Sequence, residues 1–314
     1  MVNIKKIVVL GGTGFVGKNV CECLDENKME YAIASRRTGV DLKDSKQCIQ
    51  FFNQTKPDFI VNCAAHVGSL NYVTEMAADV VLDNSKMILS IYDAVAKECP
   101  KAVIINPIAN CAYPGKAETY IEDQWWDGHL HRSVLSYGTT RRLMWSVGEC
   151  FDMQYGIRSI SLLVPNMYGP HDSTDPNKAH ALNALISKFV KAEKTGQKKI
   201  EIWGTGIAIR EWLYAKDFGR IIVNIIKNPK RVGLSEPVNI AQNFGLSVRE
   251  LLDIIQSHFH FNGEICYDPS KSDGAPKKVM DDRKFRKVFP DFVFTPFEEG
   301  IRNTITYYES IYPY

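Results

Sequence analysis

The stretch KKIVVLGGTGFVGKNVCECL, residues 5–24, predicts the fold of the chain. A β-branched strand at 7–9 runs into closely spaced glycines and then into a segment with helical periodicity. Gly12, Gly14 and Gly17 have the spacing G-x-G-x-x-G, in the strand–turn–helix context that a dinucleotide-binding turn requires. Such a turn brings backbone close to a pyrophosphate, and the helix N-terminus receives the negative charge. A tight turn without a ligand is the alternative, and the flanking strand and helix favour the nucleotide.

The composition is that of a soluble globular enzyme, with 45% hydrophobic and 24% charged residues among 314. No stretch approaches the ~20 apolar residues that a membrane span needs, and the N-terminus has no signal-peptide profile, so we expect a cytoplasmic protein without a membrane partner. The net charge of +2 argues against a nucleic-acid partner. The eight cysteines are scattered, without zinc-like spacing, so we expect reduced thiols and no metal.

Strands and helices alternate through the first half of the chain. Expected strands cover 5–10, 31–35, 58–65, 102–107 and 159–164, and expected helices cover about 15–26, 45–55, 78–98 and 136–154. This order predicts an α/β fold, a Rossmann-type doubly wound parallel sheet with helices on both faces. Ligands of such sheets bind at the carboxyl ends of the strands. The loops that begin near Gly11, Ser35, Ala64 and Pro107 should therefore face one crevice.

A Pro-, His- and Asp-rich loop after Gly169 ends this alternation. Beyond it we expect a smaller C-terminal mixed α/β region with a helix near 181–194, a strand at 199–203 and helices near 217–227 and 247–258. The expected domains are residues 1–170, to which 208–242 returns, and residues 171–314.

The end of the second expected strand carries Ser35, Arg36 and Arg37. A site for NAD usually has an Asp or Glu there, about 20 residues beyond the glycines, that accepts hydrogen bonds from the ribose. Two guanidinium groups suit a 2′-phosphate instead, so the sequence favours NADP over NAD. A solvated loop with two arginines is the alternative.

Tyr137 and Arg141 lie four residues apart in a helical segment and so share one face. The order GGTGFVG, CAA, Tyr-x-x-x-basic and PNMYGP resembles the extended short-chain dehydrogenase/reductase family of nucleotide-sugar enzymes. Within this family, AAHVGS, NCAYP, PNMYGPHD, the segment 178–180, WGTGIAIREWLY and SKSDGAPKK resemble the GDP-L-fucose synthase branch, over essentially the whole chain. The resemblance implies NADPH-dependent 3,5-epimerisation and 4-reduction of a GDP-4-keto sugar by a homodimer with a Rossmann domain and a sugar-nucleotide domain. A deoxyhexose and a heptose would use the same GDP contacts.

The resemblance also implies site residues. Cys111 and His180 match an acid/base pair that exchanges protons beside the 4-keto carbon, and Tyr137 matches the acid that protonates O4 when hydride reaches C4. A buried core cysteine and a solvated loop histidine are the alternatives. The expected cofactor contacts are Gly11, Gly12, Thr13, Gly14, Phe15, Val16, Gly17, Arg36, Arg37, Ala64, Ala65, Tyr137 and Arg141. The expected substrate contacts are Asn166, Lys188, Trp203, Arg210 and Lys278, with Lys277 beside the last.

Two positions depart from the family pattern. Ala109 stands where the family has a serine that helps to hold the 4-oxygen of the sugar, and Arg141 stands where it has a lysine. Arginine keeps the positive charge but does not give up its proton. Ser136, Thr139 and Asn110 are candidates to replace the missing hydroxyl. An epimerase with impaired redox activity and a non-catalytic sugar-nucleotide-binding subunit are therefore alternatives, although the catalytic residues that remain argue against the second.

The helix around 136–154 also suggests an interface. We expect the face that bears Leu143, Met144 and Val147 to join the helix near 78–98 between the two copies of a homodimer.

Overall fold

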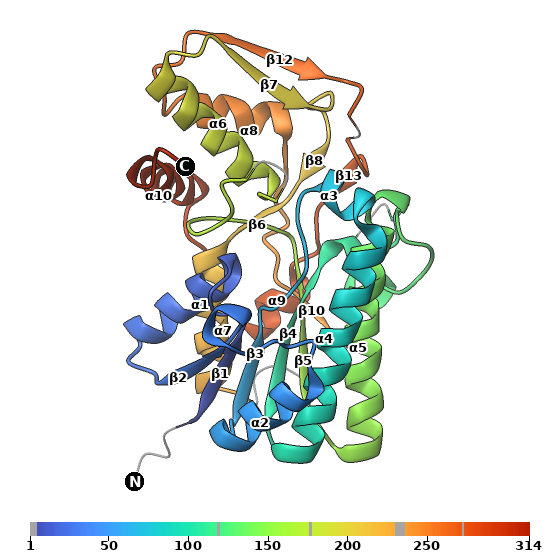
Figure 1. Ribbon diagram of the computed structural model, residues 1–314. Helices are drawn as coiled ribbons and strands as arrows, with labels where there is room; N and C mark the ends of the chain where they lie inside the picture. Colours follow the sequence, from blue (N-terminus) through green and yellow to red (C-terminus); the bar gives the residue numbers. More distant parts are fainter. Residues whose placement is uncertain (1–4, 118–119, 176–177, 230–235, 272) are drawn as a thin grey trace.

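A six-stranded parallel sheet forms the larger part of the molecule (Figure 1). The computed structural model describes residues 5–117, 120–175, 178–229, 236–271 and 273–314. Residues 176–177, in the loop after Gly169, and residue 272, in the SKSDGAPKK motif, lie outside the described residues. The strand order is β2-β1-β3-β4-β5-β10, and every neighbouring pair is parallel. The bounds are β1 Ile7–Leu10, β2 Tyr31–Ala34, β3 Phe59–Asn62, β4 Val103–Ala109, β5 Ser159–Val164 and β10 Val238–Asn239.

Helices cover both faces of this sheet, which confirms the predicted Rossmann-type fold. One face carries α1 (Phe15–Glu26), α7 (Ala215–Lys227) and α9 (Arg283–Val288), and the other carries α2 (Ser45–Thr55), α4 (Ala77–Glu98) and α5 (Leu135–Tyr155). Successive strand residues point to opposite faces. A hydrophobic core lies on each face. Ile7 and Val9 thus pack into the core on the side of α1, whereas Val8 and Leu10 pack into the core on the side of α2. The order of the strands reverses beside β1, which makes the edge next to β1 and β3 the expected binding crevice.

The smaller part of the molecule lies above the carboxyl ends of the strands in Figure 1. It contains α6 (Ala181–Thr195), α8 (Val248–Gln256), α10 (Phe297–Ser310), and the parallel pair of β7 (Lys199–Trp203) and β12 (Glu264–Asp268). These elements surround a third core, to which β7 contributes Ile200 and Ile202 from alternate positions. The predicted mixed α/β region is therefore present, with α10 as a helix that the sequence analysis did not identify.

Short elements connect the two parts. β6 (Asn166–Tyr168) pairs with β9 (Trp212–Tyr214), and β8 (Ile209–Arg210) pairs with β11 (Leu246–Ser247) and β13 (Lys277–Lys278). After β9 the chain continues through α7 and β10 in the larger part. The other described elements are α3 (Leu70–Glu75) and the 3₁₀ turns η1 (Arg36–Thr38), η2 (Asn110–Ala112), η3 (Glu122–Gln124) and η4 (Arg132–Val134).

Two local predictions were wrong. β4 continues past Pro107 to Ala109, because residues 104–109 all stay in register with β5, so the loop at this edge begins two residues later. Met144 and Val147 do not face outward. They are buried in the core between α5 and the sheet, and Leu143 packs beside them, half-buried. The apolar stripe of α5 is the one that covers the sheet, as in most amphipathic helices of globular proteins.

None of the helices that the structure describes is long and apolar enough to cross a membrane. All eight cysteines are free thiols. Within the described ranges, no cluster of three or more His, Cys, Asp or Glu side chains could hold a metal ion.

Candidate active site

The glycine turn is shaped by close contacts of backbone with backbone. Gly11 has φ of +71°, and a Cβ atom there would lie 2.8 Å from the Cα of Ala64 on the neighbouring loop. A Cβ atom on Gly17 would overlap the carbonyl oxygen of Gly11. Gly14 caps α1 without any side-chain hydrogen bond. The first turn of α1 therefore presents its N–H groups and the positive end of its dipole to the crevice.

A cleft of about 550 Å³ lies at this turn, within the usual size of a ligand site. Its lining includes seven of the expected cofactor contacts and Ser35, where one of the loops expected to face the crevice begins. These residues are Gly11, Thr13, Gly14, Ser35, Arg36, Arg37, Ala64 and Ala65. It is also lined by residues that the sequence analysis did not assign, among them Asp41, Leu42, Lys43, His66, Tyr72, Asp83, Met87 and Lys178. Gly12, Phe15, Val16 and Gly17 are not among its lining residues. They belong to the turn and the start of α1 behind it.

Both predicted arginines stand at the cleft with exposed side chains. Arg37 reaches back across it, since its Nη1 atom donates to the carbonyl oxygen of Thr13 at 3.4 Å. The turn that carries the arginines is fixed by reciprocal hydrogen bonds between Ser35 and Thr38. The two guanidinium groups thus flank the end of the cleft that follows β2.

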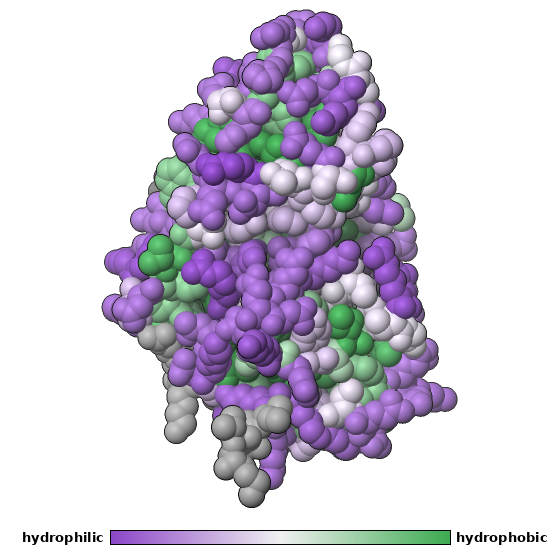
Figure 2. All heavy atoms as spheres, turned by 90° about the vertical axis from the view of Figure 1, so that its left-hand side faces the viewer, coloured by the Kyte–Doolittle hydropathy of each residue, from purple (hydrophilic) through white to green (hydrophobic). Residues whose placement is uncertain are grey.

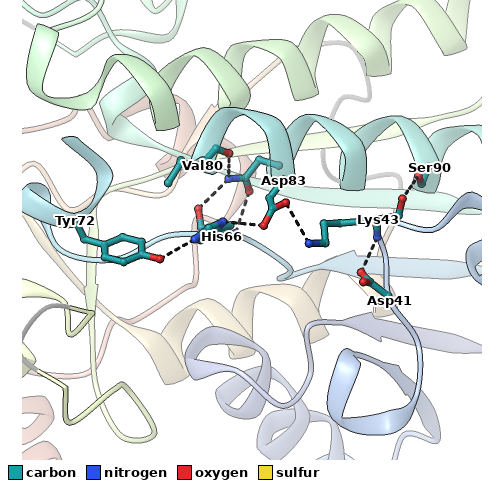
Figure 3. Close-up of polar contacts among 8 residues, drawn as sticks. Asp41, Lys43, His66, Tyr72, Val80, Asp83 and Ser90 are labelled. Atoms are coloured by element: carbon teal, nitrogen blue, oxygen red, sulfur yellow. Dashed lines mark hydrogen bonds and ion pairs between the residues drawn. The ribbon is translucent and has the colours of Figure 1, made fainter. Parts of the chain in front are cut away.

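A row of four polar side chains forms another wall of the cleft (Figure 3). The Tyr72 hydroxyl lies 2.8 Å from His66 Nε2, His66 Nδ1 lies 3.0 Å from one Asp83 oxygen, and Lys43 Nζ donates to the other at 3.1 Å. Burial alone would raise the pKa of Asp83, but Lys43 and His66 hold it below its usual range. This row joins α3, the loop after β3, α4 and the loop after β2.

Asn84 links Arg141 by hydrogen bonds to the loop after β3, which carries His66. Its side chain accepts hydrogen bonds from Arg141 Nη2 and from the His66 backbone N–H, each at 3.1 Å, and donates to the His66 carbonyl at 2.8 Å. Arg141 is 2% exposed, and its guanidinium carbon lies 4.7 Å from the centre of the Tyr137 ring. Arg141 therefore stacks on the tyrosine that the sequence predicts as the acid.

Cys111 lies close to this pair, in the turn that follows β4. A Cβ atom on Gly138 would lie 2.8 Å from the Cys111 carbonyl oxygen, so α5 packs directly against the turn. Burial raises the pKa of the Cys111 thiol, and the charges of Lys278 and Arg141 oppose this rise. Burial likewise raises the pKa of Tyr137, again opposed by Arg141. Both groups therefore carry their protons at neutral pH.

His180 reaches the glycine turn from the loop after β6. Its ring centre lies 5.2 Å from that of Phe15, and its Nδ1 atom lies 3.1 Å from both oxygens of the Asp172 carboxylate. Burial would lower the pKa of His180, but the Asp172 charge outweighs burial and raises it. Because Nδ1 is bound to the carboxylate, Nε2 is the nitrogen that can exchange a proton.

The expected substrate cations form two groups. Arg210 and Lys278 are cross-strand partners on β8 and β13, and burial lowers the pKa of both. The Lys278 charge also acts on Cys111, in the turn after β4. The second group lies in the smaller part, where Lys188 Nζ donates to the Glu201 carbonyl at 2.7 Å and lies 5.4 Å from the Trp203 ring centre.

The remaining candidates are placed as follows. Asn166 begins β6 with a half-buried side chain, and Lys277 is exposed beside Lys278. Asn84 and Asp172 are further polar residues of the site that the sequence analysis missed, besides the row in Figure 3. For Asp172 a signal existed, because it lies within the PNMYGPHD motif just ahead of His180.

Comparison with known families accounts for this arrangement. The model of the NAD dependent epimerase/dehydratase family matches residues 7–241, three quarters of the chain. The chain belongs to this family. The matched residues of this chain include the glycine turn, the six-stranded sheet and α5, and the family is one of enzymes.

Individual members of the family are similar over the full length. The GDP-L-fucose synthase of Azorhizobium caulinodans is 28% identical, over 97% of this chain and 96% of its own length. A GDP-L-fucose synthetase of Naegleria fowleri, in a crystal structure bound to NADP, is 26% identical with a TM-score of 0.85, over 99% of this chain and 96% of its own. A GDP-6-OMe-4-keto-L-xylo-heptose reductase from C. jejuni has a TM-score of 0.88 over 99% of both chains; at 21% identity it is similar in fold.

Proposed function

We propose that this protein catalyses NADPH-dependent 3,5-epimerisation and 4-reduction of a GDP-4-keto sugar. The observation that carries the proposal is that α5, with the stacked pair Tyr137 and Arg141, packs directly against the turn after β4 that holds Cys111. A thiol, a phenol and a guanidinium at this contact suit proton transfer to and from a sugar with a ketone. The full-length similarity to GDP-L-fucose synthases supports this substrate class.

The cleft fits the dinucleotide. An added Cβ at Gly11 or Gly17 would collide with backbone, and the uncapped start of α1 suits a pyrophosphate. Arg36 and Arg37 suit the 2′-phosphate of NADP. The NADP-bound structure of the Naegleria relative supports the same choice. Bound NADPH supplies the hydride that reaches C4 of the sugar.

The protein's own groups supply the protons. His180, through Nε2, removes a proton from a carbon next to the ketone, and the Asp172 carboxylate stabilises the resulting imidazolium. The protonated Cys111 thiol returns a proton to the opposite face. When hydride arrives at C4, Tyr137 gives its proton to the oxygen, and the Arg141 charge stabilises the phenolate that remains.

Binding of the GDP group is assigned to the remaining candidates. Arg210 and Lys278 lie opposite each other on β8 and β13, and two cations side by side suit the diphosphate. Lys188, Trp203 and Asn166 are proposed as further contacts with the sugar nucleotide. In this proposal residues 1–170 and 208–242 form the NADP domain, and the rest of 171–314 forms the sugar-nucleotide domain.

One incubation tests the function. GDP-4-keto-6-deoxy-mannose in D2O should take up deuterium with the enzyme alone, and NADPH absorbance should fall when the cofactor is added. Uptake without NADPH oxidation would support the epimerase with impaired redox activity, which is favoured by one observation: Asn84 and the Tyr137 ring hold Arg141 where the family has a lysine. If deuterium uptake and NADPH oxidation are both absent, the non-catalytic sugar-nucleotide-binding subunit is the alternative that remains.

The cofactor preference gives a first prediction. Replacing Arg36 by alanine should weaken NADPH binding by about 10- to 100-fold and leave NADH binding unchanged, because a charge-assisted hydrogen bond contributes about 1.5–3 kcal/mol. Titration with each cofactor measures the effect. Arg302→Ala, an exposed arginine on α10, is the matched control. Equal affinities for NADPH and NADH in the unmodified protein would contradict the preference.

The second prediction concerns the homodimer, which we place on the outer faces of α4 and α5. Leu82 and Leu89 are 51% and 52% exposed and lie on one face of α4, while Leu135 and Met153 are exposed on α5, which packs beside it. The opposite side of the molecule, where α1 lies, is largely hydrophilic (Figure 2). Leu89→Arg should convert a dimer to a monomer in sedimentation at micromolar concentration, because a charge in an apolar interface costs its desolvation.

The control for this prediction is Val293→Arg, at a residue that is exposed outside these helices. It should leave the dimer intact. A monomeric unmodified protein would exclude the interface.

A further inference from the structure

One face of α1 contacts both His180 and the segment that follows β6, residues 169–172. Phe15, Asn19 and Glu22 are spaced by four and three residues along α1, so their side chains share this face. The Phe15 ring lies against the His180 ring, and the buried Asn19 donates through Nδ2 to the Pro170 carbonyl at 3.0 Å. The helix that begins at the glycine turn therefore also supports the chain around His180.

The third contact on this face is made by His171. Its Nε2 atom lies 2.5 Å from Glu22 Oε1. Its ring packs edge-on against Tyr307 of α10, with the ring centres 4.9 Å apart. Because α1 belongs to the larger part of the molecule and α10 to the smaller part, His171 joins the two parts beside the catalytic histidine.

The backbone of His171 has φ of +73°, in the left-handed region that residues other than glycine rarely adopt. Such a conformation persists where the surrounding contacts fix it, and it occurs preferentially at functional sites. The next residue, Asp172, is 8% exposed, and its carboxylate accepts from the His180 backbone N–H at 2.8 Å and binds the His180 ring. Successive residues at this turn thus contact α1 and His180.

We propose that Glu22 and His171 are positioning residues, which hold the Asp172–His180 pair at the glycine turn. The inference rests on the proposed function, in which His180 takes a proton from the carbon next to the ketone. Both residues act through Asp172, since its carboxylate fixes the His180 ring. A shift of about 1 Å in a reacting group can cost about 10²-fold in rate, so loss of this contact should slow proton exchange. Neither residue lines the cleft at the glycine turn, so cofactor binding should not depend on the contact.

The test measures deuterium uptake by GDP-4-keto-6-deoxy-mannose. Glu22→Ala should lower the rate of uptake by about 10- to 100-fold and leave NADPH titration unchanged. Glu22→Gln should keep most of the rate, because its amide oxygen still accepts a hydrogen bond from His171. The matched control is Glu26→Ala. Glu26 ends α1 and pairs with Lys216 of α7 at 2.6 Å, within the larger part, so its loss should not change uptake.

Two further measurements separate positioning from folding. Glycine adopts the left-handed backbone without strain, so His171→Gly should lower uptake while the turn is retained. Adding Glu22→Ala to His171→Gly should lower uptake no further, because the two residues act as one contact. The backbone N–H of His180, which is bound to Asp172, should exchange with solvent faster in Glu22→Ala than in the unmodified protein, whereas the N–H groups of β1 should not.

The outcomes are distinct. Full uptake in Glu22→Ala and His171→Gly would overturn the inference and leave the proposed function intact. Additive losses, or equal losses in Glu22→Ala and Glu22→Gln together with weaker NADPH binding, would also overturn it, because the contact would then serve only the stability of the fold. An unmodified enzyme without uptake would overturn the proposed function. Faster exchange of the His180 amide in Glu22→Ala would even then support the positioning contact, and unchanged exchange would overturn it.

Discussion

Cys111→Ala is expected to lower deuterium uptake by GDP-4-keto-6-deoxy-mannose by about 10²–10⁴-fold, the usual contribution of a positioned general acid. The thiol lies in the turn after β4, 8% exposed, and burial raises its pKa, opposed by Lys278 and Arg141. It therefore holds its proton at neutral pH and can give it to a carbanion. NADPH binding should be unchanged, because the cleft at the glycine turn is lined by other residues.

Cys150→Ala provides the matched control. This cysteine is exposed on α5, so its replacement should leave both exchange and reduction at the unmodified rate. Deuterium uptake that survives Cys111→Ala would show that another group delivers the proton, and it would remove Cys111 from the mechanism.

The larger part of the fold was predictable because its strands are buried on both faces. Parallel strands of this kind appear as continuous apolar runs, and IVVL, FIVN and SISLLV are such runs. The short strands β6, β8, β9, β11 and β13 have only two or three residues, which is too few for any periodicity. Their pairing depends on segments far apart in the chain. α10 was missed although Phe297, Ile301, Ile305 and Tyr308 have helical spacing.

In the candidate site, too, local motifs could be predicted from the sequence, whereas contacts between distant segments could not. The glycine turn and its arginines could be predicted because each motif is local and carries a physical requirement. The row of Lys43, Asp83, His66 and Tyr72 comes from four elements, and no single stretch of sequence predicts that these side chains meet. Asn84 is a similar case, because its partners Arg141 and His66 are distant in the chain. The assigned catalytic roles stay predictions until the variants are measured.

Tyr137→Phe is expected to slow NADPH oxidation by about 10²–10⁴-fold, because it removes the acid that we propose protonates the 4-oxygen. Burial raises the pKa of Tyr137 and Arg141 opposes the rise, so the phenol is protonated at neutral pH. Phenylalanine keeps the ring on which the Arg141 guanidinium stacks at 4.7 Å, so local packing should be preserved. The variant thus removes one proton donor and little else.

The role of Tyr137 is tested by comparing proton exchange with NADPH-dependent reduction in this variant. In the proposed mechanism proton exchange uses Cys111 and His180, so Tyr137→Phe should reduce deuterium uptake much less than NADPH oxidation. Tyr155→Phe, an exposed tyrosine at the end of the same helix, should affect neither. Equal losses of exchange and reduction in Tyr137→Phe would mean that the hydroxyl stabilises the enolate as well. Undiminished reduction would instead show that the proton reaches the sugar oxygen from another donor, and Tyr137 would then serve only to support Arg141.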